Sequence, residues 1–145
     1  MLDSTAIAAL FFKDPYSDRM DGAVKAYDMM HTLDLAYSEV ANVAWKRACL
    51  FGEQLDTCRH ALELAEEFMQ STCNVIEARG LVDEALRLGF EERIAVYDSL
   101  FLAAARRNSA KVLTTDEKLH AKVQRSKELH GLTLLPDPVQ DARRR

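Results

Sequence analysis

Several residue types and patterns are scarce in this sequence, and each scarcity excludes a class of protein. The 145 residues include three cysteines, an odd number, and no CxxC pair, which argues against a disulfide framework. No apolar run approaches the ~18 residues that a membrane span requires. The N-terminus lacks the basic region and long apolar stretch of a signal peptide. We therefore expect a protein of the reducing cytoplasm, in which Cys49, Cys58 and Cys73 are small buried hydrophobes.

Positive charge is also in short supply. With 19 Lys and Arg against 23 Asp and Glu, the formal net charge is -4, so the chain as a whole has no electrostatic attraction to nucleic acid. Any binding of RNA or DNA has to come from a local basic patch or a bound cation. The four histidines, His31, His60, His120 and His130, are scattered without ligand spacing. The absence of a His/Cys cluster argues against a zinc site.

The length and composition indicate a single globular domain. Hydrophobic residues make up 48% and charged residues 29% of the chain, which is ordinary for a soluble globular protein. A chain of this length can bury roughly 68–70% of its unfolded surface. The composition changes only at Pro136. We predict one domain over residues 1–136 and a short basic tail over residues 137–145, which we expect to be a solvated, frayed terminus.

Short apolar segments alternate with helical patterns along the chain. The strand candidates are residues 1–3, 32–36, 73–77, 111–114 and 133–135. Helices are predicted over residues 5–12, 38–51, 55–70, 81–88 and 93–108. Two further helices are predicted to begin after Asp14-Pro15 and after Thr114. This order predicts an α/β fold of three layers, with a short-stranded, mainly parallel central sheet flanked by helices.

Local signals place the ends of these helices and the expected core. The predicted start signals are Asp14 as an N-cap with Pro15 at the first helical position, Ser38 as an N-cap, and a capping box of Thr114 with Glu117. The predicted stop signals are Gly52 and Gly89. Helical spacing assigns these larger apolar side chains to the core: Met29, Met30, Trp45, Phe68 and Tyr97.

Four acidic residues lie at the edges of apolar segments: Asp3, Glu39, Asp98 and Asp116. Ligands of open parallel sheets bind beyond the carboxyl ends of the strands. Asp3 would end the first strand, Asp116 would follow a later one, and Glu39 would open the helix after the second. Asp98 would reach the same end of the sheet from the side.

Carboxylates brought so close together would repel each other and raise one another's pKa values. A hard cation such as Mg²⁺ or Mn²⁺ would compensate, because it prefers oxygen ligands. Where two such metals bind, they lie about 3.5–4 Å apart and stabilise both the attacking and the leaving oxygen of a phosphate. Taken singly, each acid is explained equally well as a helix cap or a first-turn charge.

Four segments in order resemble a PIN domain, most closely the VapC-type ribonuclease toxins. The segments are Leu2-Asp3-Ser4, Ser38 to Trp45 (SEVANVAW), Tyr97 to Ala103 (YDSLFLA) and Leu113 to Leu119 (LTTDEKL). The resemblance covers nearly the whole chain, to about Pro136. Each motif alone is weak, whereas the four in this order form a fairly specific signature.

The resemblance implies a metal-dependent endoribonuclease that hydrolyses RNA with activated water. The residues that match the family's catalytic, metal-binding acids are Asp3, Glu39, Asp98 and Asp116, with Mg²⁺ or Mn²⁺ as cofactor. Asn42 and Thr114 match supporting positions that orient a carboxylate, a water or a phosphate. The resemblance also implies a homodimer and an antitoxin protein that covers the active site. Candidate phosphate-binding residues are Lys46, Arg47, Arg106, Arg107 and Lys111.

The family usually has several apolar residues before its first Asp, whereas only Met1 and Leu2 precede Asp3 here. We therefore expect Asp3 to be less firmly held than in the family. Two alternatives remain open: an RNA-processing nuclease without a toxin role, and a catalytically silent binding module on the same scaffold. A phospho-acceptor receiver domain is not favoured, because the paired acids and the late Lys of that fold are not in place.

Overall fold

The structure is a computed structural model that describes residues 1–136. The predicted tail over residues 137–145 lies outside the described residues. The elements follow the chain in this order: α1 (Ser4–Phe11), α2 (Ser17–Lys25), β1 (Met30–Leu33), α3 (Leu35–Phe51), α4 (Leu55–Thr72), β2 (Cys73–Ile76), the 3₁₀ helix η1 (Ala78–Leu81), α5 (Val82–Glu92), α6 (Val96–Arg107), β3 (Val112–Leu113), α7 (Glu117–Arg125) and β4 (Thr133–Leu134). Within this part of the chain, no helix combines the length and the apolarity needed to cross a bilayer.

The strands form two parallel pairs that the N-terminus joins. β1 pairs with β2, and β3 pairs with β4. The Leu2 amide donates to the His31 carbonyl at 2.7 Å, and the Asp3 amide donates to the Leu113 carbonyl at 3.2 Å. Residues 1–3 therefore lie between β1 and β3, where Leu2 forms a parallel bridge with Leu113. The predicted first strand is very short, and it occupies the centre of the sheet.

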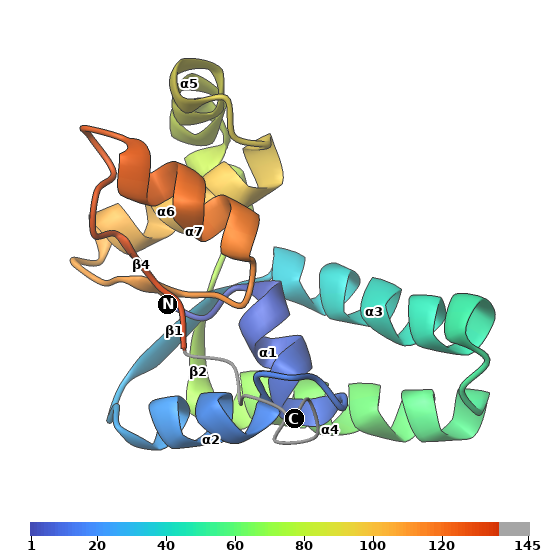
Figure 1. Cartoon of the computed structure of the whole chain (residues 1–145). Helices are drawn as coiled ribbons and strands as arrows, with labels where there is room; N and C mark the ends of the chain where they lie inside the picture. The colour runs from blue at the N-terminus through green and yellow to red at the C-terminus, as the bar shows by residue number, and fades with distance from the viewer. Residues whose placement is uncertain (137–145) are drawn as a thin grey trace, which may run out of the picture.

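Helices cover both sides of these strands (Figure 1): α1 to α4 lie on one side and α5 to α7 on the other. The apolar run in the middle of α6 is fully buried, and its small alanines let the helix approach β1 and β3 closely. On the other side, Ile7 of α1 and Met69 of α4 are buried in the same core. The predicted three-layer α/β arrangement is confirmed.

Three of the predicted helix start signals are wrong. Asp14 and Pro15 precede α2 by three and two residues, and the Asp14 carboxylate accepts from the Tyr16 amide within the preceding turn. α3 begins at Leu35 instead of Ser38, because Asp34 already occupies the N-cap position. The Thr114–Glu117 capping box does not form, since the cap of α7 is Asp116. A local signal identifies a helix start but not which of several polar neighbours takes it.

Of the two glycines that were predicted to end helices, one does so and the other does not. Gly52 ends α3 in the left-handed conformation with φ 71°, as predicted. Gly89 is instead an internal residue of α5, which ends at Arg93 in the left-handed region. A Cβ at position 89 would meet the Ile94 carbonyl oxygen at 2.8 Å. Gly89 therefore permits close packing between α5 and the start of α6.

Several side chains predicted to be buried are on the surface. Met29 is 73% exposed, Trp45 52% and Tyr97 55%, whereas Met30 is buried. Phe68 is half-buried, and its ring lies 5.5 Å from that of Phe11. Of the cysteines, Cys58 is buried and Cys73 half-buried, but Cys49 is exposed. Helical spacing identifies one face of a helix, and it cannot tell which parts of that face another element covers.

Candidate functional site

A cavity of about 460 Å³ opens at the carboxyl end of the central strands. All four predicted acids line it: Asp3, Glu39, Asp98 and Asp116. Asp3 follows the N-terminal segment and Asp116 follows β3, while Glu39 comes from α3 and Asp98 from α6. The fold therefore brings together four carboxylates that are up to 113 residues apart in sequence.

Asp3 is held firmly at the floor of this cavity, contrary to the expectation from its short strand. It is 5% exposed and caps α1, with its Oδ1 atom accepting from the Ala6 amide at 2.9 Å. The same oxygen accepts from the Thr5 hydroxyl at 2.7 Å. These contacts, with the backbone bond to Leu113, replace the support that a longer strand would give.

Asp116 is the N-cap of α7. Its Oδ1 atom accepts from the Lys118 amide at 2.8 Å and from the Leu119 amide at 2.9 Å. The Asp116 amide donates to the hydroxyl of the fully buried Thr114 at 3.0 Å. Thr114 thus fixes the chain just before the acid instead of capping the helix itself.

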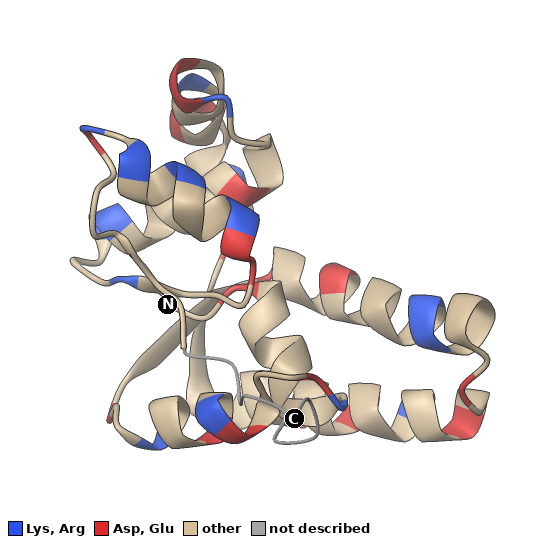
Figure 2. Ribbon diagram, viewed as in Figure 1, with Lys and Arg blue, Asp and Glu red and all other residues tan. Residues whose placement is uncertain are grey.

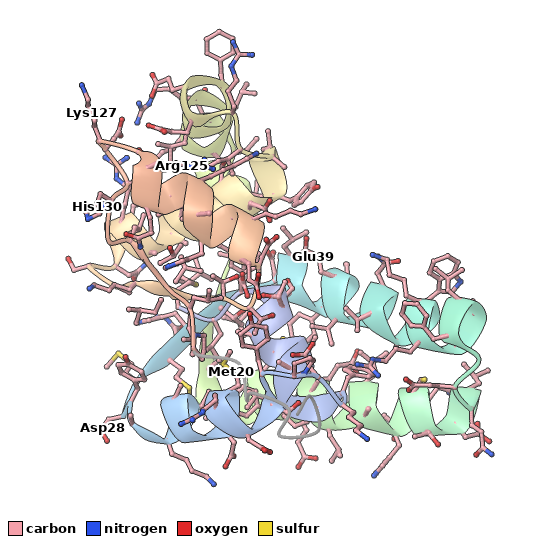
Figure 3. The ribbon with its side chains drawn as sticks, viewed as in Figure 1. Met20, Asp28, Glu39, Arg125, Lys127 and His130 are labelled. Atoms are coloured by element: carbon pink, nitrogen blue, oxygen red, sulfur yellow. The ribbon has the colours of Figure 1, made fainter. Side chains whose placement is uncertain are left out.

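Glu39 lies in the second turn of α3, where its Oε2 atom accepts a hydrogen bond from the Ser4 hydroxyl. Asn42, one turn further along the same helix, also lines the cavity. Residues three apart on a helix share a face, so Asn42 has the position predicted for a supporting group. Glu39 also appears at the start of α3 in Figure 3, facing the ends of the strands.

Asp98 differs from the other three acids because no described residue forms a hydrogen bond with its carboxylate. It lies in the first turn of α6. Its pKa is raised to about 6, mainly by burial and in addition by the nearby charges of Asp116, Asp3 and Glu39. Lys122 opposes this shift only weakly, and its ammonium group donates to the Arg93 carbonyl at 2.9 Å.

Burial also raises the pKa of Asp3 to about 6, although hydrogen bonds from Thr114, Ala6 and Thr5 act in the opposite direction. The charge of Asp116 adds to the rise. The cavity is therefore a place where negative charge accumulates at a cost in free energy. A cation would remove that cost, because opposite charge favours the ionised form of each carboxyl.

The hydrogen bonds leave oxygen atoms available for such a cation. In Asp116 and Glu39, one carboxylate oxygen accepts bonds from the protein and the other accepts none from any described residue. Carboxylate oxygens are the ligands that Mg²⁺ and Mn²⁺ prefer, so the donor set fits the predicted metal. Over residues 1–136, no three acidic, histidine or cysteine side chains converge closely enough to form a ready-made metal site. The acids line one cavity without closing on one point.

The sequence analysis missed several residues of this cavity. Ser4, Thr5 and Tyr97 line it together with the acids. The signal for Ser4 and Thr5 was their position directly after Asp3, where short hydroxyl side chains can bond a helix cap. Nothing in the sequence shows that the Thr5 hydroxyl also accepts from the Thr115 amide at 2.9 Å, because that contact spans 110 residues.

The five candidate phosphate-binding residues differ in the cavity that they line and in whether they form an ion pair. Lys46 lines the acidic cavity, whereas Lys111 lines a different cavity at the opposite end of the strands. Arg106 pairs with Glu128, and Arg107 pairs with Glu84 at 2.8 Å. Arg47 pairs with Glu53 at 2.7 Å. Of these five, only Lys46 is both at the site and without an ion-pair partner in the described part of the chain.

Comparisons with known proteins agree with this geometry. The PIN domain family profile matches residues 1–125, which include all four acids. The Pyrobaculum aerophilum protein named Ribonuclease VapC3 is 34% identical over 122 residues, which are 84% of this chain and 92% of that protein. The crystal structure of PAE2754 from Pyrobaculum aerophilum matches with a TM-score of 0.65 and 26% identity, over 83% of this chain and 76% of that one.

Proposed function

Because this chain belongs to the PIN domain family, we propose that it is an endoribonuclease that depends on Mg²⁺ or Mn²⁺ and hydrolyses phosphodiester bonds of RNA. One observation carries the proposal: four carboxylates from four separate segments line one cavity at the carboxyl end of a parallel sheet. The similarity to a protein named as a ribonuclease supports the choice of RNA as substrate.

In this proposal, Asp3, Glu39, Asp98 and Asp116 would hold the cation through carboxylate oxygens. When bound, a divalent cation polarises a phosphate and lowers the pKa of a water molecule. Asp98 has no protein hydrogen bond and a raised pKa, so it is suited to accept a proton from the attacking water. Thr114 and Ser4 keep Asp3 and Glu39 oriented. Asn42 is free to bind water or phosphate at the rim.

The proposed biological role is that of the toxin in a toxin–antitoxin pair in the cytoplasm. The name of the Pyrobaculum aerophilum relative supports it. We further propose a homodimer and an antitoxin protein that covers the cavity. Two groups of exposed apolar side chains are suited to such contacts. One group lies in the second half of α3 and comprises Trp45, Leu50 and Phe51. The other lies on one face of α5 and comprises Val82, Leu86 and Phe90.

The test is cleavage of a 5′-labelled RNA by the purified protein with Mg²⁺ or Mn²⁺, with a chelator, and in the Asp98→Asn variant. We expect cleavage only with metal and only in the wild type. The Asn side chain keeps the shape of Asp98, so circular dichroism should show an unchanged fold. Equal cleavage in the chelator, or by Asp98→Asn, would refute the proposal.

The toxin role needs its own test, since a nuclease that matures RNA would give the same cleavage result. Expression should arrest growth, and co-expression of a small reading frame found immediately upstream of the gene should restore it. Cleavage in vitro without growth arrest would assign the protein to RNA processing instead.

A catalytically silent binding module is the second candidate, and the absence of three convergent ligands over residues 1–136 favours it. A titration with Mn²⁺ separates the two functions. Failure to bind Mn²⁺, combined with retained binding of RNA or a protein partner, would favour the silent module.

A further inference from the structure

The acidic cavity contains a single basic side chain among its lining residues, Lys46 of α3. Lys46 is exposed. Among the described residues, no carboxylate lies within ion-pair distance of it. Two neighbouring cations are engaged: Arg47 with Glu53 and the Lys13 carbonyl, and Lys122 with the Arg93 carbonyl. The ammonium group of Lys46 is therefore available to an incoming anion.

The cavity also has an exposed aromatic ring at its edge. Tyr97 precedes Asp98 in α6 and lines the cavity with it, yet 55% of the residue is exposed. Its hydroxyl forms no hydrogen bond with any described residue. An aromatic ring left in solvent beside a charged cavity offers a flat surface on which a nucleobase can stack, whatever the base.

We propose that Lys46 and Tyr97 position the RNA in this cavity. Lys46 binds a phosphate other than the one that is cut, and Tyr97 stacks on an unpaired base next to the reacting phosphate. The proposal rests on the proposed function, because it takes RNA as the substrate of the acidic cavity. It adds two residues that touch the substrate without touching the metal.

The spacing along α3 suits this division of roles. Glu39 and Lys46 are seven residues apart and lie on one face of the helix, about 10 Å along its axis. Figure 2 shows an acidic band near the start of α3 and a basic band further along the helix. A strand cut next to Glu39 would therefore pass Lys46 with a later phosphate.

The charge balance gives a physical reason for such a contact. The chain carries a net charge of -4, and the four carboxylates repel every phosphate of the substrate. A bound cation offsets this repulsion at the phosphate that it contacts, whereas the flanking phosphates have no such counter-charge. The flanking phosphates need a positive group of their own, and Lys46 is the one that the cavity provides.

The first experiment compares Lys46→Met with Lys127→Met. Lys127 is also exposed, and it lies far from Glu39 in Figure 3. We expect Lys46→Met to raise KM about fivefold to tenfold with kcat nearly unchanged. For RNA binding by this variant, the slope of log Kd against log salt concentration should be smaller than in the wild type by about 0.7. This is the value for one lost phosphate contact of a single strand. Lys46→Arg should restore both quantities, and Lys127→Met should match the wild type.

The second experiment compares Tyr97→Leu with Tyr27→Leu, a tyrosine of similar exposure that lines the other cavity. Binding of a fluorescein-labelled single-stranded RNA of about 12 nucleotides is measured in the Asp98→Asn background, so that no strand is cut. One base at a time is replaced by an abasic site. With Tyr97 present, one position should lose about tenfold in affinity. In Tyr97→Leu this position should become insensitive, whereas Tyr97→Phe should retain the effect.

The outcomes separate this proposal from the proposed function. If the wild type cuts no RNA with any metal, the proposed function fails, and the binding titrations still decide the roles of Lys46 and Tyr97. If the wild type cuts RNA but Lys46→Met equals Lys127→Met in KM and salt slope, the role of Lys46 is refuted. An abasic profile that is the same in Tyr97→Leu and Tyr27→Leu would likewise refute the role of Tyr97.

Discussion

The two ends of the parallel strands carry cavities of opposite character. At the carboxyl end, about 460 Å³ are lined by four acids and their hydroxyl partners. At the amino end, about 300 Å³ are lined mainly by apolar side chains, among them Met1, Tyr27 and Met29, with Lys111 and His31 as the basic groups. No Asp or Glu lines the amino-end cavity. The same short strands thus separate a charged cavity from an apolar one.

The difference shows how a very short sheet builds a reactive site. At the carboxyl end, the N-terminal segment leads into α1 and β3 leads into α7, so Asp3 and Asp116 cap helices while they face the cavity. Their backbone contacts give rigidity that a two-residue strand lacks. At the amino end, β2 follows the last turn of α4, and β1, β3 and β4 follow loops, so no helix start offers such a cap there. Chemistry is therefore expected at the carboxyl end alone.

The largest expected difference between the cavities is in kcat, when one charged side chain is replaced in each of them. Asp98→Asn should lower kcat for RNA cleavage by roughly 10³-fold or more, because it removes a group that acts on the reacting atoms. The matched change in the amino-end cavity, Lys111→Met, should leave kcat within about twofold. Single-turnover cleavage with Mn²⁺ measures both. Comparable losses in the two variants would mean that the cavities do not differ in function.

The next effect concerns metal and stability. A cation bound only by the folded protein at 100 times its Kd stabilises it by about 2.7 kcal/mol, which corresponds to a rise in Tm of about 5–10 °C for a chain of this size. We expect this rise on adding Mn²⁺ to the wild type and to Lys111→Met. A Tm rise of the same size in Asp98→Asn would place the metal elsewhere.

A smaller effect is expected for Asn42, which lines the acidic cavity but carries no charge. Asn42→Ala should lower kcat/KM about tenfold, in the range found for groups that support metal ligands. Its Tm without metal should equal that of the wild type, because the side chain is exposed. Unchanged kcat/KM would remove Asn42 from the site.

The smallest effect is a pH dependence of stability without metal. Burial and neighbouring carboxylates raise the pKa of Asp98 from 3.8 to about 6. Between these values the folded protein holds a proton that the unfolded chain has released, so the free energy of unfolding falls as pH rises. Asp98→Asn should therefore be more stable than the wild type by about 1 kcal/mol at about pH 8, allowing for solvent screening.

Urea unfolding in a chelator measures this difference. At about pH 3 the two proteins should have equal stability, because the Asp98 carboxyl is then protonated in both states. A wild type that is more stable than Asp98→Asn at about pH 8 would contradict the predicted repulsion in the cavity.

The sequence was sufficient to predict the order of the elements and the meeting of four acids in one cavity. Both predictions depend on local patterns. The apolar periods locate every strand to within a few residues, and each acid stands next to an element boundary. The sequence was insufficient wherever a distant contact decides. Asp3 seemed weakly held because part of its support comes from Thr114 and Leu113, more than 100 residues away.

The sequence also could not predict which side chains of a helix are exposed. Trp45 and Tyr97 have the spacing of core residues, yet both lie on the surface. A helical stripe extends along the whole helix, whereas the neighbouring elements cover only part of it. The same limit left two candidate phosphate-binding residues, Lys46 and Arg47, indistinguishable in the sequence, because only the structure shows that Arg47 pairs with Glu53.

The measurement that tests the central claim most directly is a crystal structure with Mn²⁺, located by its anomalous scattering. The account predicts a peak in the acidic cavity, at about 2.0–2.3 Å from oxygens of at least two of the acids Asp3, Glu39, Asp98 and Asp116. It also predicts that the peak disappears in Asp98→Asn. An empty acidic cavity at saturating Mn²⁺, with the carboxylates as far apart as before, would contradict the account.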